Sequence, residues 1–173
     1  MHIFLDFDGV LHPDAVYAPR NKPIELRAKG ELFMHAHVLI EALAPYPEAK
    51  IVLSTSWVRA FGYSRTIKKM PPALASRVIG ATYHTDMKDQ SPMYGSGYDS
   101  FQGLSRYQQI INHVNRNAIK NWFAIDDLHS GTEIHEWPKD MRHYLLLTEE
   151  QEGLATDHKI AELNTKLMSI QYD

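Results

Sequence analysis

Several apolar segments of this chain end in side chains capable of acid–base or metal chemistry. They are two pairs of carboxylates and a run of hydroxyls: Asp6 with Asp8, Asp126 with Asp127, and Ser54, Thr55 and Ser56. In a parallel α/β sheet the carboxyl ends of the strands face one crevice, where ligands bind. We therefore expect four carboxylates and a hydroxyl to meet there, although each group alone is equally typical of a helix cap or a turn.

The expected cluster of carboxylates requires a counter-charge. Carboxylates held close together repel one another and raise each other's pKa. A hard cation resolves that conflict, and Mg²⁺ suits a site made of oxygen ligands that also receives a phosphate. The sequence therefore predicts a Mg²⁺ site.

The elements that must position these groups are short strands alternating with amphipathic helices. This alternation predicts an α/β domain with a mostly parallel sheet of about five strands. The expected strands are 3–5, 51–53, 78–83, 122–125 and 144–147. The expected helices are 32–43, 104–114 and 156–170, the last with Thr156 as its N-cap.

Two stretches lack either pattern. Residues 12–30, with three prolines, are expected to form a loop or flap, and residues 91–103 a Gly/Ser loop with three aromatics. Only 46 residues separate Asp8 from Thr55, and the sheet and helices use most of them. We therefore expect no large cap domain and an open site that admits a bulky or polymeric substrate.

Composition limits the remaining classes of protein. A length of 173 residues suits a single domain covering 1–173, and a net charge of −3 gives no bulk attraction to nucleic acid or anionic membrane. The absence of cysteine excludes disulfide scaffolds and thiolate chemistry. No signal peptide or membrane-spanning run is apparent, so we expect a cytoplasmic protein; the oligomeric state stays open.

The strand ends resemble the motifs of the haloacid dehalogenase (HAD) superfamily, whose three-layer Rossmann-like fold is therefore expected. Residues 5–10 (LDFDGV) resemble its first motif, residues 51–55 (IVLST) its second and residues 122–127 (WFAIDD) its fourth. The third motif is one Lys or Arg near the start of the helix before the fourth. Arg106 fits best and Lys120 is the alternative, just as Ser54 is the alternative to Thr55.

The resemblance implies a role for each residue. Asp6 would attack phosphorus and Asp8 would act as acid and base, while Thr55 and Arg106 bind the phosphoryl oxygens. The implied metal ligands are Asp6, Asp8, Asp126 and Asp127. The remaining candidates, on the phosphate or substrate side, are Gly9, Ser56, Trp57 and Arg59. Residues 56–59 are also similar to a small group of HAD domains, some of them associated with nucleic-acid repair enzymes.

The predicted function is that of a Mg²⁺-dependent phosphomonoester hydrolase acting through an aspartyl-phosphate. Its substrate would be a phosphorylated small molecule, a nucleotide or a nucleic-acid end. Alternatives are a phosphotransferase on the same scaffold and a non-catalytic phosphate- or metal-binding module. A signalling receiver is disfavoured, because in receivers the acidic pair precedes the phosphorylated Asp.

Some weaker signals allow two interpretations. His12 and His129 follow the acidic motifs and could touch a substrate, and Trp57 could either stack on a base or pack in the core. A group of cations and aromatics could bind a polyanion or form a solvated helix face. That group is Arg59, Arg65, Lys68 and Lys69 with Phe61 and Tyr63.

Overall fold

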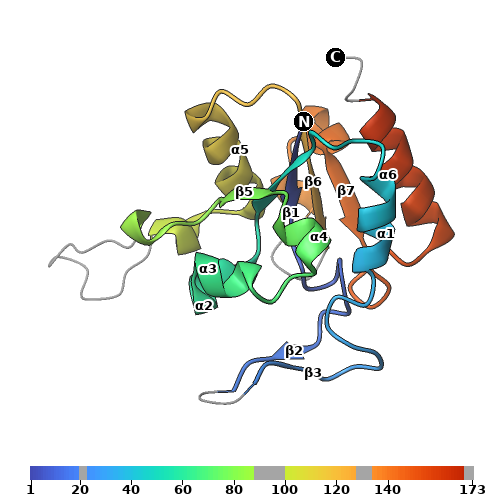
Figure 1. Cartoon of the computed structure of the whole chain (residues 1–173). Coiled ribbons are helices and arrows are strands. Elements are labelled where there is room, and N and C mark those ends of the chain that lie inside the picture. The colour runs from blue at the N-terminus through green and yellow to red at the C-terminus, as the bar shows by residue number, and fades with distance from the viewer. Residues whose placement is uncertain (20–22, 88–99, 128–133, 170–173) are drawn as a thin grey trace, which may run out of the picture.

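The computed structural model describes residues 1–19, 23–87, 100–127 and 134–169, and these residues build a five-stranded parallel sheet between two layers of helices (Figure 1). The strand order is β5-β4-β1-β6-β7, with β1 in the centre. The strands are β1 (His2–Leu5), β4 (Lys50–Leu53), β5 (Val78–Ala81), β6 (Trp122–Asp127) and β7 (Leu145–Thr148). This confirms the expected α/β fold.

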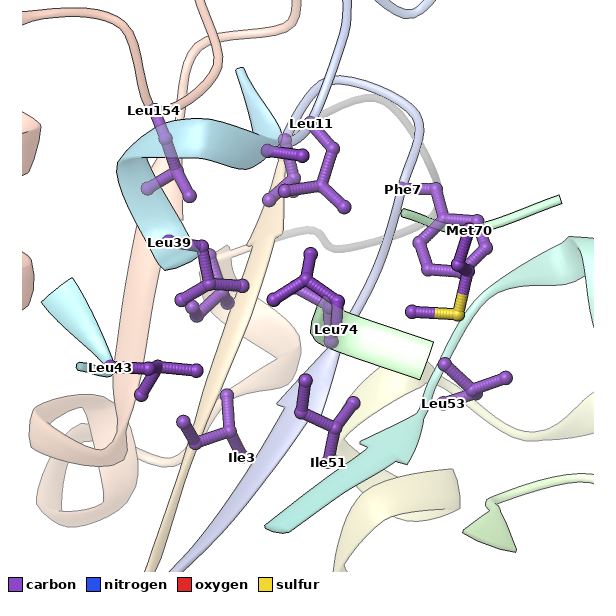
Figure 2. Close-up of a cluster of buried hydrophobic side chains, with 14 of the residues drawn as sticks. Ile3, Phe7, Leu11, Leu39, Leu43, Ile51, Leu53, Met70, Leu74 and Leu154 are labelled. Atoms are coloured by element: carbon purple, nitrogen blue, oxygen red, sulfur yellow. The ribbon is translucent and has the colours of Figure 1, made fainter. Parts of the chain in front are cut away.

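The core lies on both faces of the sheet, because successive residues of a strand point to opposite sides. Ile3 and Leu5 of β1 belong to the cluster covered by three helices, and Phe4 belongs to the cluster covered by one. The three are α1 (Ala36–Ala42), α4 (Pro72–Ala75) and α6 (Asp157–Ser169); the one is α5 (Arg106–Arg116). Figure 2 shows Leu39, Leu43 and Leu74 over Ile3 and Ile51 of the sheet.

Two short helices follow β4 at the carboxyl end of the sheet. They are α2 (Ser56–Phe61) and α3 (Tyr63–Ile67), and with α4 they fill most of the segment before β5. Short 3-10 turns span Thr85–Met87, Ser100–Gly103, Ile134–Glu136 and Lys139–Tyr144. Among the residues that the structure describes, no large cap domain is inserted, as expected. Nor is any described helix both long and apolar enough to cross a bilayer.

The flap is more regular than the sequence predicts. Within residues 12–30, a hairpin pairs β2 (Val16–Tyr17) with β3 (Glu25–Leu26), and Figure 1 shows it projecting from the carboxyl end of the sheet. Strands of two residues carry too little periodicity to be recognised in the sequence. Most of the loop predicted at 91–103, with Tyr94 and Tyr98, lies outside the described residues.

Helix boundaries differ from the prediction where local backbone geometry decides them. The helix expected over 32–43 begins only at Ala36, because Phe33 takes a left-handed φ of 64° that breaks the helical path. The helix expected over 104–114 begins at Arg106. The Ser105 hydroxyl accepts a hydrogen bond from the Gln108 backbone, and the Gln108 side chain accepts one from the Ser105 backbone.

Candidate active site

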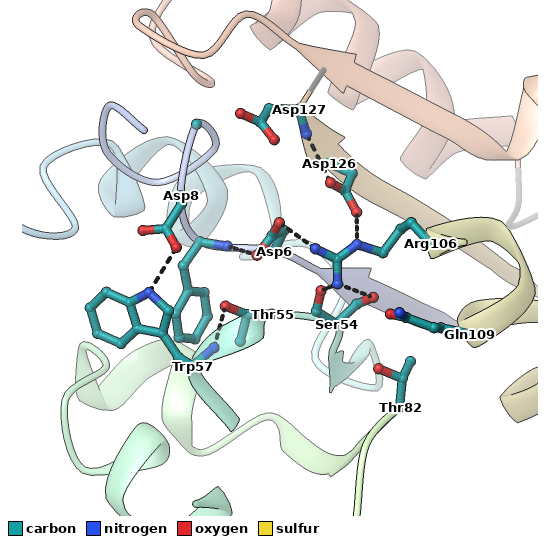
Figure 3. Close-up of polar contacts among 12 residues, drawn as sticks. Asp6, Asp8, Ser54, Thr55, Trp57, Thr82, Arg106, Gln109, Asp126 and Asp127 are labelled. Carbon is teal, nitrogen blue, oxygen red and sulfur yellow. Dashed lines mark hydrogen bonds and ion pairs between the residues drawn. The ribbon is translucent and has the colours of Figure 1, made fainter. Parts of the chain in front are cut away.

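The carboxyl ends of β1 and β6 bring three aspartates together. The two strands are in register up to Leu5 opposite Ile125, so Asp6, which follows β1, comes next to Asp126 near the end of β6. Carboxylate oxygens of Asp6, Asp126 and Asp127 all lie within 4.8 Å of one another, and all three residues are buried. Figure 3 shows this cluster facing the first turn of α5.

Arg106, the first residue of α5, enters the cluster from the neighbouring layer. Its Nη2 lies 2.9 Å from Oδ2 of Asp6, and its Nε lies 2.9 Å from Oδ2 of Asp126. Its Nη1 donates to the backbone carbonyl of Ser54 and lies 3.5 Å from the Ser54 hydroxyl. The alternative cation, Lys120, precedes β6 at the opposite end of the sheet, where it lines a hollow with Met1 and His2. The structure thus places Arg106, and not Lys120, among the carboxylates.

Burial and charge act against each other in this cluster. Burial raises the pKa of Asp6 well above its ordinary value, the Arg106 guanidinium opposes that shift, and the charges of Asp126 and Asp8 reinforce it. Burial disfavours the charge of Arg106, but Asp126 and Asp6 outweigh that effect and raise its pKa. One guanidinium thus faces several buried carboxylates. This imbalance leaves room for a second positive charge.

Asp8 lies beside the cluster, and its carboxylate turns toward two other side chains. The indole N–H of Trp57 donates to Oδ2 at 2.8 Å, and Nε2 of His12 lies 3.0 Å from Oδ1. Trp57 and His12 are 2% and 0% exposed. For Trp57 the structure therefore shows the core-packing alternative, and it buries His12 away from the surface. His129 lies outside the described residues.

The hydroxyls after β4 have different surroundings. Ser54 lies against Arg106, whereas Thr55 caps α2, its hydroxyl accepting a 3.3 Å hydrogen bond from the Trp57 backbone. Both residues are buried. Ser56 and Arg59 are exposed on α2.

The turn after Asp8 brings backbone close to the acidic pair. Gly9 has a φ of +67°, and a Cβ built on it would lie 2.0 Å from Oδ2 of Asp127. Only glycine fits this position without a shift of the neighbouring carboxylate. The absence of a side chain at Gly9 therefore lets the backbone pass close to the Asp127 carboxylate.

Thr148, at the end of β7, is a residue that the sequence analysis missed. Its buried hydroxyl lies 2.7 Å from the Gly9 carbonyl and 3.2 Å from the Asp126 carbonyl, so it joins the loop after β1 to β6. In addition, the Leu154 backbone N–H donates to the Val10 carbonyl at 3.0 Å. A signal existed: Thr148 comes at the end of an apolar strand, as do Asp6, Ser54 and Asp126.

A central parallel sheet in this order, with acids after β1 and at the end of β6, defines an HAD-like α/β domain. Residues 2–159 match the family model described as "HAD domain in Swiss Army Knife RNA repair proteins", and the chain belongs to this family. No curated protein and no solved structure matches the chain. HAD domains generally carry out hydrolase or phosphoryl-transfer chemistry and typically use Mg²⁺.

Proposed function

We propose that this protein is a Mg²⁺-dependent phosphomonoesterase that removes terminal phosphates from RNA, with Asp6 as its covalent nucleophile. One observation carries the chemical part of this proposal. Asp6, Asp126 and Asp127 converge within 4.8 Å at the carboxyl end of the sheet, and Arg106 enters the same volume.

The donor set fits Mg²⁺. The three aspartates offer only oxygen ligands, the type that Mg²⁺ prefers, and their charge exceeds that of Arg106. When bound, Mg²⁺ would neutralise charge on the phosphoryl oxygens as it develops. Asp6, Asp126 and Asp127 would hold it, and Arg106 would bind the phosphoryl group.

The reaction proceeds in two steps that the chain's own residues perform. A carboxylate oxygen of Asp6 attacks phosphorus, the bond from phosphorus to the ester oxygen breaks, and Asp8 gives its proton to the leaving alkoxide. A water molecule then attacks the aspartyl-phosphate while Asp8 takes its proton. The bond from phosphorus to the Asp6 oxygen breaks, and inorganic phosphate and free Asp6 result.

The proposal of RNA ends as substrates rests on the family and on a local excess of positive charge. Between Glu48 and Asp86 the sequence contains six Lys or Arg and no acidic residue, although the whole chain has a net charge of −3. Arg77 is used structurally, since it donates to the carbonyls of Tyr46 and Leu43. Four exposed cations remain on α2, α3 and the turn after it: Arg59, Arg65, Lys68 and Lys69. The helices that carry these cations begin directly after Thr55, and their charge suits a phosphate backbone.

A phosphatase assay with aryl phosphate, with and without Mg²⁺, tests the chemistry. We expect turnover that requires Mg²⁺ and is abolished in Asp6→Asn, because an amide cannot form the aspartyl-phosphate. Acid-quenched protein should carry a phosphoryl group in the wild type and none in Asp6→Asn. Phosphorylated oligoribonucleotides should then be better substrates than sugar phosphates.

Three outcomes would contradict the proposal. Turnover that survives in Asp6→Asn would exclude Asp6 as the nucleophile. Phosphate transfer to added alcohols in preference to water would identify a phosphotransferase. Binding of Mg²⁺ and phosphate without turnover of any substrate would identify a non-catalytic module.

A further inference from the structure

Each oxygen of the Asp8 carboxylate is contacted by a buried side chain. The Trp57 indole N–H donates to Oδ2 at 2.8 Å, and His12 Nε2 lies 3.0 Å from Oδ1 (Figure 3 shows the indole contact). Because the two rings are 2% and 0% exposed, they are covered by protein, and the site residue that they contact is Asp8. Their influence on the reaction must pass through Asp8.

The hydrogen bonds of His12 determine which of its nitrogens carries the proton. The backbone N–H of Phe33 donates to Nδ1 at 3.2 Å, so Nδ1 acts as an acceptor. Nε2 then carries the ring proton and donates a hydrogen bond to Asp8. Phe33 makes this contact from a left-handed backbone conformation with a φ of 64°, uncommon for an aromatic residue. Such strained conformations persist where the surroundings enforce them.

The indole of Trp57 is fixed by the aromatic rings around it. Its centroid lies 5.5 Å from Phe7, 5.6 Å from Phe33 and 5.7 Å from Phe61, at steep interplanar angles. The tilted ring of His12 lies 5.8 Å away. A ring enclosed in this way holds its N–H in one direction.

We propose that Trp57 and His12 are positioning residues that fix the orientation of the Asp8 carboxylate for proton transfer. This inference rests on the proposed function, in which Asp8 is the acid and base. Two donors on different oxygens fix both side-chain torsions of Asp8, and each oxygen keeps a second lone pair for the transferred proton. Proton transfer depends on such geometry, because the acid must lie within hydrogen-bonding distance of the leaving oxygen.

Trp57→Phe separates the two steps of the reaction. The variant keeps a buried ring and removes the N–H. A nitrophenolate leaves without a proton, so on nitrophenyl phosphate the variant should release about one equivalent at the wild-type rate and then turn over slowly. On an alkyl phosphate, whose leaving alkoxide needs the proton, kcat should fall on the order of tenfold or more.

Two comparisons separate positioning from general damage to the fold. Trp137→Phe changes another buried indole, in the core cluster on the α5 face, and should leave the ratio of alkyl to aryl phosphate rates unchanged. His12→Gln, which keeps an N–H near the place of Nε2, should retain more alkyl phosphate activity than His12→Leu. In a ¹H–¹⁵N spectrum, the indole resonance that is lost in Trp57→Phe should shift in Asp8→Asn.

The possible results distinguish failure of this inference from failure of the proposed function. A burst at the wild-type rate on the aryl substrate, with a first turnover that is slowed only on the alkyl substrate, supports the inference. Equal loss on both substrates without a burst, or no change in Trp57→Phe, overturns it while leaving the proposed function intact. A wild-type protein without phosphatase activity overturns the proposed function, and this inference with it.

Discussion

Gly9 illustrates how one residue without a side chain sets the geometry of the site. Its left-handed backbone and its contact with Asp127 impose separate demands, and a methyl group violates both. The left-handed conformation alone costs an L-residue about 1–2 kcal/mol. Any further cost comes from displacing the Asp127 carboxylate.

We therefore expect Gly9→Ala to lower the free energy of unfolding by at least about 1 kcal/mol and to weaken Mg²⁺ binding. Denaturant unfolding and calorimetric titration with Mg²⁺ measure the two effects. Gly103→Ala is the matched control, because a Cβ there meets nothing within 4 Å. Unchanged Mg²⁺ affinity in Gly9→Ala would show that the Asp127 side chain is not a ligand.

At the level of elements, β7 contributes to the site through Thr148. The buried hydroxyl lies within hydrogen-bonding distance of two carbonyls, and Thr148→Val removes this donor. A buried acceptor left without a donor costs about 1–3 kcal/mol. We expect this loss of stability together with reduced activity, because the loop with Asp8 is no longer held to β6.

Thermal or chemical unfolding of Thr148→Val checks this expectation. The control is Thr82→Val, at another buried strand end, whose hydroxyl makes a longer bond of 3.4 Å to the Leu53 carbonyl. Equal destabilisation by the two variants would mean that the link from the loop after β1 to β6 contributes little to stability.

The helices after β4 bear the expected contact with RNA. Replacing Arg65, Lys68 and Lys69 together by Gln should raise KM for a phosphorylated oligoribonucleotide several-fold and leave hydrolysis of aryl phosphate unchanged. The dependence of log KM on log salt should also become shallower, because fewer counterions are released on binding.

Three exposed lysines elsewhere in the chain, changed in Lys29→Gln, Lys120→Gln and Lys139→Gln, serve as the control for net charge. An equal rise of KM in this control would reduce the effect to overall charge. An unchanged KM in the variant of Arg65, Lys68 and Lys69 would mean that these cations form a solvated helix face.

For the whole molecule, the buried acidic centre couples folding to pH and to metal. Because the pKa of Asp6 is raised in the folded protein, the folded state keeps this proton to a higher pH than the unfolded chain does. In the metal-free protein, the stabilising contribution of Asp6 is present at low pH. It decreases as pH rises from roughly 4 toward the raised pKa.

Mg²⁺ needs ionised ligands, so its stabilising effect should have the opposite pH dependence. We expect Mg²⁺ to raise the melting temperature more at about pH 7.5 than at about pH 5. A concentration of about 100 times Kd adds about 2.7 kcal/mol. Melting curves at both pH values measure this, and Asp127→Asn should lack most of the increase. An increase independent of pH would place the ion elsewhere.

The sequence was sufficient to predict the sheet and the residues at its carboxyl end. Strands such as 3–5 and 122–125 are nearly all apolar, as strands buried on both faces are, and parallel packing brings their ends to one crevice. Arg106 was also predictable, because a basic residue opens an amphipathic helix before the acidic pair.

What the sequence did not predict are contacts set by side-chain direction and by unusual backbone. The sequence left Trp57 open between substrate and core and His12 as a possible substrate contact, because nothing in their spacing indicates that both turn toward Asp8. The left-handed Phe33 is equally hidden, since an aromatic residue rarely adopts this conformation. Such details depend on how distant elements pack.

The loop that carries Asp8 and Gly9 is held by residues that the ribosome makes after all of the proposed ligands. Thr148 contacts the Gly9 carbonyl, and Leu154 contacts the Val10 carbonyl. When Asp127 has been synthesised, every proposed ligand exists, but the residues that anchor the first loop do not. A nascent chain arrested at that stage would hold its acids in an unfinished arrangement, so the complete centre is acquired only after Thr148 and Leu154 have been made.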